Sequence, residues 1–478
     1  MSAAVQPIRI SPNRILAVLL VSALSYGILG SIIVPALPTF QHDFDASQNA
    51  VTWILTAYLL AGAAATAIIG RLGDMYGKKR VLVVTLTVLA AGTLLAALAS
   101  SLGVLIAARA MQGVAGGLFP LAFGIVRDEF PRERVAHGIG LISAGLGIGG
   151  GIGIVVPGVI VDRLGWHWLF WIPFAIIVLA AVLTWRLVPE SPVRVLGRVN
   201  WPAAVSMVTG FTAILLGVTQ ATTWGWGSPK TIGLIAAGLL VCALWVLIEI
   251  RSREPLIDMT MMRVRGVWTT NVVAFMFGGG MYASLAIYPE LAQLPTSTGF
   301  GYGASITTTG LYLLSETVAV AIFGSLAGRI SARIGAKATL TTGCVVMLAS
   351  FVFLAVQRAH PYDLVISVAL MGAGLGIGFA SLSNLSVNAV RPDQTGAASG
   401  MNTVLRMIGG AIAGQLAATL IAGQQVDGLP ATEGFTQALW LLVGCLVLAV
   451  LASLLVPHLR DAPAVEPEHP GDGGRRPA

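Results

Sequence analysis

The chain has 478 residues, of which 56% are hydrophobic and only 10% are charged, and its formal net charge is +7. Ordinary soluble domains carry about 25% charged residues, so this composition excludes a globular protein with a water-exposed surface. The basic residues lie between apolar segments, which excludes a nucleic-acid-binding face and indicates contact with lipid headgroups. The three cysteines stand apart within apolar runs, and we expect neither a metal site nor a cofactor.

Fourteen apolar segments are long enough to be membrane helices, because a helix that crosses the bilayer needs about 20 largely apolar residues. The first segment continues into the pattern of the others, so it is predicted to be a helix rather than a cleaved signal. The predicted fold is an all-α polytopic membrane protein with helices near residues 15–38, 50–70, 81–100, 103–126, 136–161, 167–188, 201–222, 231–250, 267–291, 304–327, 338–357, 362–386, 397–422 and 434–456.

Basic residues predict the orientation of these helices, because Lys and Arg gather in the cytoplasmic loops of membrane proteins. Of the 28 Lys and Arg, 23 lie on the side that holds the N-terminus, and Arg163, Lys230 and Arg358 lie on the opposite side. The remaining two, Arg109 and Arg406, lie within helices. We therefore expect a multi-pass protein of the cell membrane with both termini in the cytoplasm.

An internal repeat divides the chain. The charged loop at 70–79, between the second and third helices, matches 328–337 at an offset of 258 residues, and parts of 140–150 match 400–410 at an offset of 260. Nearly constant offsets indicate that a whole six-helix bundle is duplicated, which is typical of transporters. The predicted parts are two bundles at residues 1–190 and 267–460, a linker with two extra helices at 191–266, and a disordered cytoplasmic tail at 461–478.

Two motifs resemble those of a known family. Residues 70–82 fit the pattern G-x-L-a-D-r-x-G-r-k-x-x-l, with Met75 in place of the arginine that follows the aspartate. The fourth helix fits l-x-x-x-R-x-x-q-G with Leu105, Arg109, Gln112 and Gly113. The chain therefore resembles the major facilitator superfamily, and within it the fourteen-helix drug:proton antiporter branch.

The resemblance implies a gate at the cytoplasmic side. In that family the acid of the loop holds the two halves together, and this role falls on Asp74 here. A carboxylate can do so by facing the N-terminus of a neighbouring helix or nearby basic side chains. The alternative is a solvated turn acid without a role. The predicted gating residues are Gly70, Asp74, Gly77, Lys78 and Arg80.

Two further motifs of that branch are altered in this chain. The pattern G-x-x-x-G-P-x-x-G-G would place a proline after Gly149, where this chain has Gly150, and the acid of helix 1 is replaced by Leu29. A proton carried by that acid in relatives must be carried elsewhere here, or not at all. These differences keep open the alternative of a proton-coupled importer, or of a dedicated exporter of one small metabolite.

Charged side chains inside membrane helices are costly and usually functional. Glu316 is predicted to carry protons or to hold a cationic substrate, and a carboxyl used only for packing is the alternative. Arg109 either borders the proton path, as the resemblance implies, or is a structural arginine bonded to backbone carbonyls. Glu290 is a second proton candidate or an interfacial acid. Arg406 is hypothesised to pair with Glu316 across the cavity.

The substrate cavity is expected between the bundles, where aromatic and apolar walls suit bulky lipophilic molecules, especially cations. No P-loop motif is present, and no group of acids resembles a catalytic site, so an ATP-driven pump and a lipid-modifying enzyme are disfavoured. The prediction is a proton-coupled secondary transporter, monomeric in the lipid bilayer, that exports lipophilic, often cationic drugs or metabolites by alternating access. Its predicted substrate-binding residues are Tyr26, Tyr58, Gln112, Phe119, Tyr282, Tyr312, Asn384, Asn402 and Arg406.

Overall fold

The computed structural model describes residues 11–46, 48–191, 200–252, 255, 257–426 and 429–457. The predicted tail at 461–478 lies outside the described residues, as does part of the predicted linker. Within the described ranges, thirteen helices are long and apolar enough to span a membrane, and α3, bent by 40°, makes a fourteenth if its two parts form one span. The prediction of a fourteen-helix membrane protein is confirmed.

The first bundle holds six spans, and a 3-10 turn, η2 (Val114–Gly117), joins two helices into the fourth of them. Short elements at one end of the bundle are η1 (Val34–Ala36), α2 (Leu37–Asp43) and α8 (Pro157–Leu164). The spans are α1 (Pro12–Ser31), α3 (Gln48–Tyr76), α4 (Lys78–Ala97), α5 (Leu102–Gly113) with α6 (Leu118–Glu129), α7 (Arg132–Val155) and α9 (Trp168–Leu187).

Prolines shorten two of the predicted helices. The first was predicted to reach residue 38, but α1 ends at Ser31 and the chain continues through η1, which contains Pro35. The fifth was predicted to reach residue 161, but α7 ends at Val155 and Pro157 begins α8. Proline has no backbone N–H to donate and is favoured in the first turn of a helix, so it starts a new element at both places.

The inserted pair and the second bundle follow in chain order. The insertion contains α10 (Trp201–Trp224), α11 (Pro229–Arg251) and the short α12 (Met259–Arg263). A two-residue hairpin, β1 (Gln425–Val426) with β2 (Leu429–Pro430), precedes the last helix. The second bundle contains α13 (Arg265–Gln293), η3 (Thr296–Thr298), α14 (Ile306–Ile334), α15 (Ala336–Val356), α16 (Pro361–Asn388), η4 (Pro392–Gln394), α17 (Thr395–Ala422) and α18 (Thr432–Leu455).

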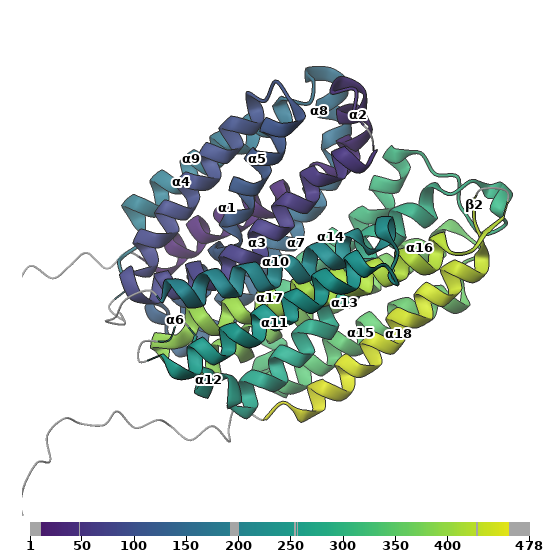
Figure 1. The fold of residues 1–478 in the computed structure, drawn as a ribbon. Coiled ribbons are helices and arrows are strands. Elements are labelled where there is room, and N and C mark those ends of the chain that lie inside the picture. Colours follow the sequence, from purple (N-terminus) through teal and green to yellow (C-terminus); the bar gives the residue numbers. More distant parts are fainter. Residues whose placement is uncertain are drawn as a thin grey trace, which may run out of the picture.

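The two bundles lie side by side in Figure 1, with the purple and blue helices in one and the green and yellow helices in the other. Helix α10 of the insertion contacts both bundles, through α3 and α17. We call the end where α1 begins and α18 ends the termini face, and the opposite end the far face. The loop at Gly77 lies at the termini face, and α2, α8 and the β1–β2 hairpin lie at the far face (Figure 1).

Glycines allow the two bundles to approach closely along two pairs of helices. A Cβ atom on Gly70 of α3 would collide with the backbone carbonyl of Gly396 of α17. On the other side, a Cβ atom on Gly147 or Gly151 of α7 would collide with side chains of α14. Small residues at helix contacts allow backbones to pack closely in membranes, where no hydrophobic effect drives helices together.

Candidate substrate and proton site

The N-terminal half of the site is built around Arg109, which α5 places in the middle of the first bundle. Its side chain is 0% exposed. Nη1 donates to the carbonyl of Leu29 at 2.9 Å and to Oε1 of Gln112 at 2.7 Å, and Nε donates to the carbonyl of Ile54 at 3.3 Å. The guanidinium lies 4.1 Å from the centre of the Tyr58 ring. These contacts match the structural alternative, an arginine bonded to backbone carbonyls.

The bond to Leu29 links Arg109 to the position where the antiporter branch often carries an acid. Here a neutral carbonyl takes the place of a carboxylate, so the guanidinium has no counter-ion at this point. Its Nη2 atom is buried and has no hydrogen-bond partner within the described residues. Gln112 is fixed in turn, because its Nε2 donates to Thr93 Oγ1 at 3.2 Å.

Aromatic rings cover this half of the site. The rings of Tyr58 and Phe119 each lie 5.6 Å from that of Tyr26, and Phe119 meets it edge to face. All three side chains are buried. The structure therefore brings together four of the predicted binding residues, Tyr26, Tyr58, Gln112 and Phe119, around Arg109.

The C-terminal half of the site is built around Arg406 of α17. Its guanidinium lies 4.2 Å from the centre of the Phe379 ring, on α16, and interacts with the hydroxyl of Tyr282, on α13. Its Nη2 donates to Thr403 Oγ1 at 3.3 Å, while Nε is buried and has no hydrogen-bond partner within the described residues. Phe379 was not predicted from the sequence, because nothing in an apolar helix indicates which ring will face an arginine on another helix.

The two halves meet across the bundle interface. The hydroxyl of Tyr282 is close enough to Tyr26 and Tyr58 to interact with both electrostatically. A Cβ atom on Gly62 of α3 would lie 3.6 Å from the Tyr26 hydroxyl and 3.5 Å from the end of Met407, on α17. The predicted residues from the first bundle and Tyr282 from the second thus border one central region.

Glu316 lies in α14, ten residues from the helix start at Ile306. At 1.5 Å per residue this is about 15 Å along the helix, which is deep in the membrane. The side chain is half-buried, and it makes neither a hydrogen bond nor an ion pair within the described residues. The hypothesised pair with Arg406 does not form, because Arg406 faces Phe379 and Tyr282 instead.

The other predicted site residues are placed apart from this centre or are used in packing. Asn402 donates to the carbonyl of Thr270 and to Oδ1 of Asn271, both at 3.2 Å. Asn384 is buried and accepts a hydrogen bond from Asn388 at 2.8 Å. Tyr312 is half-buried on α14, and Glu290 is exposed near the far-face end of α13.

At the termini face, Asp74 joins the two bundles. Its Oδ2 accepts hydrogen bonds from the backbone N–H groups of Gly396 at 2.9 Å and Ala397 at 3.3 Å, at the start of α17. The carboxylate is buried and lies 3.8 Å from the Nζ of Lys78. A carboxylate facing a helix N-terminus is stabilised by the helix dipole and by the free N–H groups. The solvated alternative for Asp74 is therefore wrong.

The other residues of the loop hold it in place. Lys78 is buried and pairs with Asp128 of α6 at 2.6 Å, and Ser191 also hydrogen-bonds that carboxylate. Gly77 has φ of 104°, which disfavours residues with a side chain. Arg80 is exposed and lies 3.5 Å from Glu190, whose carboxylate fills the space above Gly77.

A second bond between the bundles was not predicted from the sequence. Arg127 of α6 donates from Nη1 to the carbonyl of Val387 and to Thr395 Oγ1, both at 2.6 Å, and from Nη2 to the carbonyl of Val390 at 2.8 Å. It thereby caps the end of α16, where carbonyls lack partners within the helix. An arginine at a loop is ordinary in sequence, so only its position opposite α16 reveals this contact.

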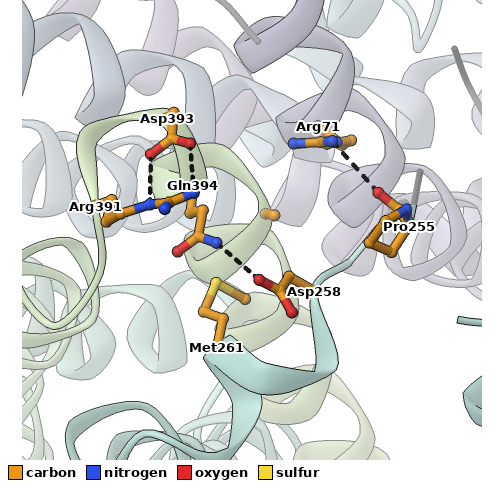
Figure 2. Close-up of a pocket in the computed structure, with 8 residues that line it drawn as sticks. Arg71, Pro255, Asp258, Met261, Arg391, Asp393 and Gln394 are labelled. Atoms are coloured by element: carbon orange, nitrogen blue, oxygen red, sulfur yellow. Dashed lines mark hydrogen bonds and ion pairs between the residues drawn. The ribbon is translucent and has the colours of Figure 1, made fainter. Parts of the chain in front are cut away.

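A cavity of about 170 Å³ lies beside this junction, where the first bundle, the insertion and the second bundle meet. Figure 2 shows Arg71 donating to the carbonyl of Pro255 and Gln394 donating to Asp258. Burial alone would raise the pKa of Asp258, but hydrogen bonds from Thr260 and Met261 outweigh it and lower the pKa. Asp258 therefore stays ionised at neutral pH and ties the insertion to the second bundle.

Comparison with known proteins identifies the family. The sequence profile of the Major Facilitator Superfamily matches residues 19–414, and a second match covers 270–478. The chain belongs to this superfamily. Its spans are consistent with the fourteen-helix branch, and membership in a family of transporters confirms the expectation that it is not an enzyme.

Similar proteins include several named for drug resistance. The chain is 27% identical to multidrug resistance protein 3 of Bacillus subtilis over 82% of its own length and 76% of the relative. It is 26% identical to the tetracenomycin C resistance and export protein of Streptomyces glaucescens, with 84% and 74% covered. It is 27% identical to the puromycin resistance protein pur8 of Streptomyces alboniger, with 94% and 92% covered.

Solved structures of the superfamily share the fold. The human organic anion transporter MFSD10 aligns with a TM-score of 0.67 at 16% identity, over 93% of this chain and all of that one. The proton:xylose symporter XylE aligns with a TM-score of 0.66 at 14% identity, over 93% of this chain and 96% of that one. At such identities the likeness concerns the fold alone.

Proposed function

We propose that this protein is a proton-coupled secondary transporter that exports lipophilic compounds across the cell membrane by alternating access, with its termini face in the cytoplasm. The names of the relatives support export of drug-like compounds. The excess of basic residues on the side of the termini supports the orientation. The ring cluster at Tyr26, Tyr58 and Phe119 supports a lipophilic substrate, because apolar ligands bind to aromatic walls.

The observation that carries proton coupling is the isolation of Glu316. A carboxyl group that binds and releases protons in turn must not be held ionised by a permanent cation. Glu316 meets this condition, since it is half-buried deep in α14 and has no ion pair within the described residues. An intramembrane acid of this kind is costly to keep without a function.

Alternating access is proposed to occur by rocking of the bundles at 1–190 and 267–460. The hydrogen bonds of Asp74 and Arg127 close the termini face between them. We propose that Gly70, Asp74, Gly77, Lys78 and Arg80 form the gate that breaks when this face opens. Asp74 and Gly70 touch the opposite bundle directly, and the other three position the loop.

Proton flux from proteoliposomes tests the coupling. Purified protein is reconstituted with a pH-sensitive dye inside, and tetraphenylphosphonium, puromycin, tetracenomycin C and the anion naphthalene-1-acetate are added in turn under an imposed pH gradient. We expect substrate-driven proton flux in the wild type and none in Glu316→Gln, while Glu290→Gln, an exposed acid, retains the flux. Flux that persists in Glu316→Gln places the proton site elsewhere, with Glu290 next in line. A wild type without flux for any compound contradicts proton-coupled export.

Gly70→Ala tests the gate. The added methyl group would strike the backbone of Gly396, and overpacking of this kind costs about 1–3 kcal/mol in the closed form. Spin labels at Tyr76→Cys and Arg391→Cys, with Cys242, Cys344 and Cys445 replaced, should report a longer distance across the termini face. Gly414→Ala is the control, since no atom lies near its added carbon. An unchanged distance in Gly70→Ala would contradict the proposed gate.

A further inference from the structure

We propose that Arg406 is the binding site for an acidic group of the substrate, so that the exported compounds are lipophilic molecules with a carboxylate or a similar anionic oxygen. This inference rests on the proposed function for the transport step, but the binding site can be tested without it. The sequence suggested lipophilic substrates that are often cationic. This proposal keeps the lipophilic body and replaces the cation by an anionic group.

Arg406 has no counter-ion among the residues that the structure describes. Its side chain is 3% exposed and lies within α17, a membrane span. Within the described residues its polar contacts are the neutral hydroxyls of Thr403 and Tyr282, and its Nε has no partner at all. A buried guanidinium without a carboxylate costs free energy that an anionic ligand would recover.

Neighbouring residues hold Arg406 in an orientation suited to a ligand. Phe379 stacks on the guanidinium at 4.2 Å, which holds the planar group in one orientation. Gly278 and Gly410 let the neighbouring helix α13 pack against α17 here, since a Cβ atom on either would collide with Arg406 or Tyr282. A fixed fork of N–H donors is the arrangement that binds carboxylate oxygens best.

The side of α17 that carries Arg406 faces the central region. Thr403, Arg406 and Met407 are spaced three and four residues apart, so they share one face of the helix. Thr403 and Met407 are half-buried, and Met407 approaches Gly62 of the other bundle, which also lies beside the Tyr26 hydroxyl. Tyr282 connects Arg406 to the ring cluster of the first bundle.

These features define the ligand. An acidic oxygen would lie at Nε and the free edge of the Arg406 guanidinium, and an apolar or aromatic body would extend toward Tyr26 and Tyr58. A lipophilic cation would instead meet two guanidinium groups, since Arg109 also lacks a carboxylate partner. Like charges in a medium of low dielectric constant repel strongly, which disfavours that cation near the arginines.

The test compares two probes of nearly the same shape. Binding of tritiated naphthalene-1-acetate and naphthalene-1-acetamide to purified full-length protein in lipid nanodiscs is measured at neutral pH by scintillation proximity. A hydrogen bond to a charged group contributes enough that the acetate should bind about tenfold to a hundredfold more tightly than the amide. Arg406→Gln should remove this preference and leave the affinity for the amide unchanged.

Two further variants serve as controls for loss of charge and for misfolding. Arg186→Gln removes an exposed positive charge from α9 and should retain the full preference for the acetate. Arg406→Lys keeps the charge and should retain a reduced preference, which provides a readout if the glutamine variant does not fold. A wild type that does not bind the acetate more tightly than the amide overturns the proposal, and so does an Arg406→Gln variant that loses both probes equally.

Failure of this site and failure of proton coupling give different results. If the acetate preference depends on Arg406 while proton flux is absent, the anion site stands and the coupling at Glu316 is wrong. If flux depends on Glu316 while the two probes bind alike, the coupling stands and the anion site is wrong.

Discussion

The two bundles each bury one arginine in the middle of the membrane, and the surroundings of the two differ. Arg109 donates to Leu29, Ile54 and Gln112. Arg406 stacks on a ring in the same way, but its hydrogen-bond partners are neutral hydroxyls and its Nε is free within the described residues. Each guanidinium is buried, stacks on a ring and has one nitrogen without a partner in the described part of the chain, so these properties do not distinguish a structural arginine from a binding one. The acceptors do, because Arg109 bonds to backbone carbonyls, whereas Arg406 bonds there only to side-chain hydroxyls.

Arg109→Met should have the largest effect on stability. It leaves the carbonyl of Leu29 and the side chain of Gln112 without their donor in a buried site, whereas the carbonyl of Ile54, inside α3, keeps its partner in the helix. We expect a loss of about 2–4 kcal/mol, because each unsatisfied buried group is costly. The apparent melting temperature of the purified protein in detergent measures the loss. A melting temperature equal to that of the wild type would show that these bonds do not hold the bundle together.

Gln112→Leu should have the next largest effect. It removes one acceptor of Arg109 and the donor to Thr93, but it leaves the bonds to the two carbonyls in place. A loss of about 1–2 kcal/mol is expected in the same melting experiment. A loss as large as that of Arg109→Met would mean that the glutamine, and not the carbonyls, dominates the network.

Arg406→Met should change stability in the opposite direction. Replacing a buried charge that has no counter-ion by an apolar side chain of similar length is often neutral or stabilising, so we expect a gain of about 0–1 kcal/mol. Methionine also keeps favourable contact with the Phe379 ring. If this variant melts as far below the wild type as Arg109→Met, Arg406 is structural too and the contrast between the bundles fails.

Tyr58→Phe should have the smallest effect. It keeps the ring that stacks on Arg109 and removes a hydroxyl, which interacts with the Tyr26 side chain and lies 3.5 Å from the Tyr26 carbonyl. We expect a change of about 0.5 kcal/mol or less, since a hydrogen bond at this distance is weak. A larger loss would indicate that the hydroxyl supports the site in a way that the ring contact does not explain.

Much of the fold follows from local properties of the sequence. The lengths of the apolar segments predicted the spans, because a helix must satisfy its own backbone to cross the bilayer. The errors occurred at Pro35 and Pro157, which end helices before the apolar pattern ends. One predicted partner of Asp74, the N-terminus of a neighbouring helix, was also correct. A carboxylate between two bundles needs hydrogen-bond donors, and the first turn of a helix has free N–H groups.

The partners of the buried charges were decided by the tertiary structure. The positions of Arg109, Glu316 and Arg406 within apolar segments marked them as costly, but the pair hypothesised for Glu316 and Arg406 does not form, and the role of Arg109 stayed open. Which groups meet depends on how each helix is rotated within its bundle, and that rotation is set by the packing of glycines such as Gly70 and Gly410 against other helices. Hydropathy determines that a helix spans the membrane, and only packing determines which side chains face each other across it.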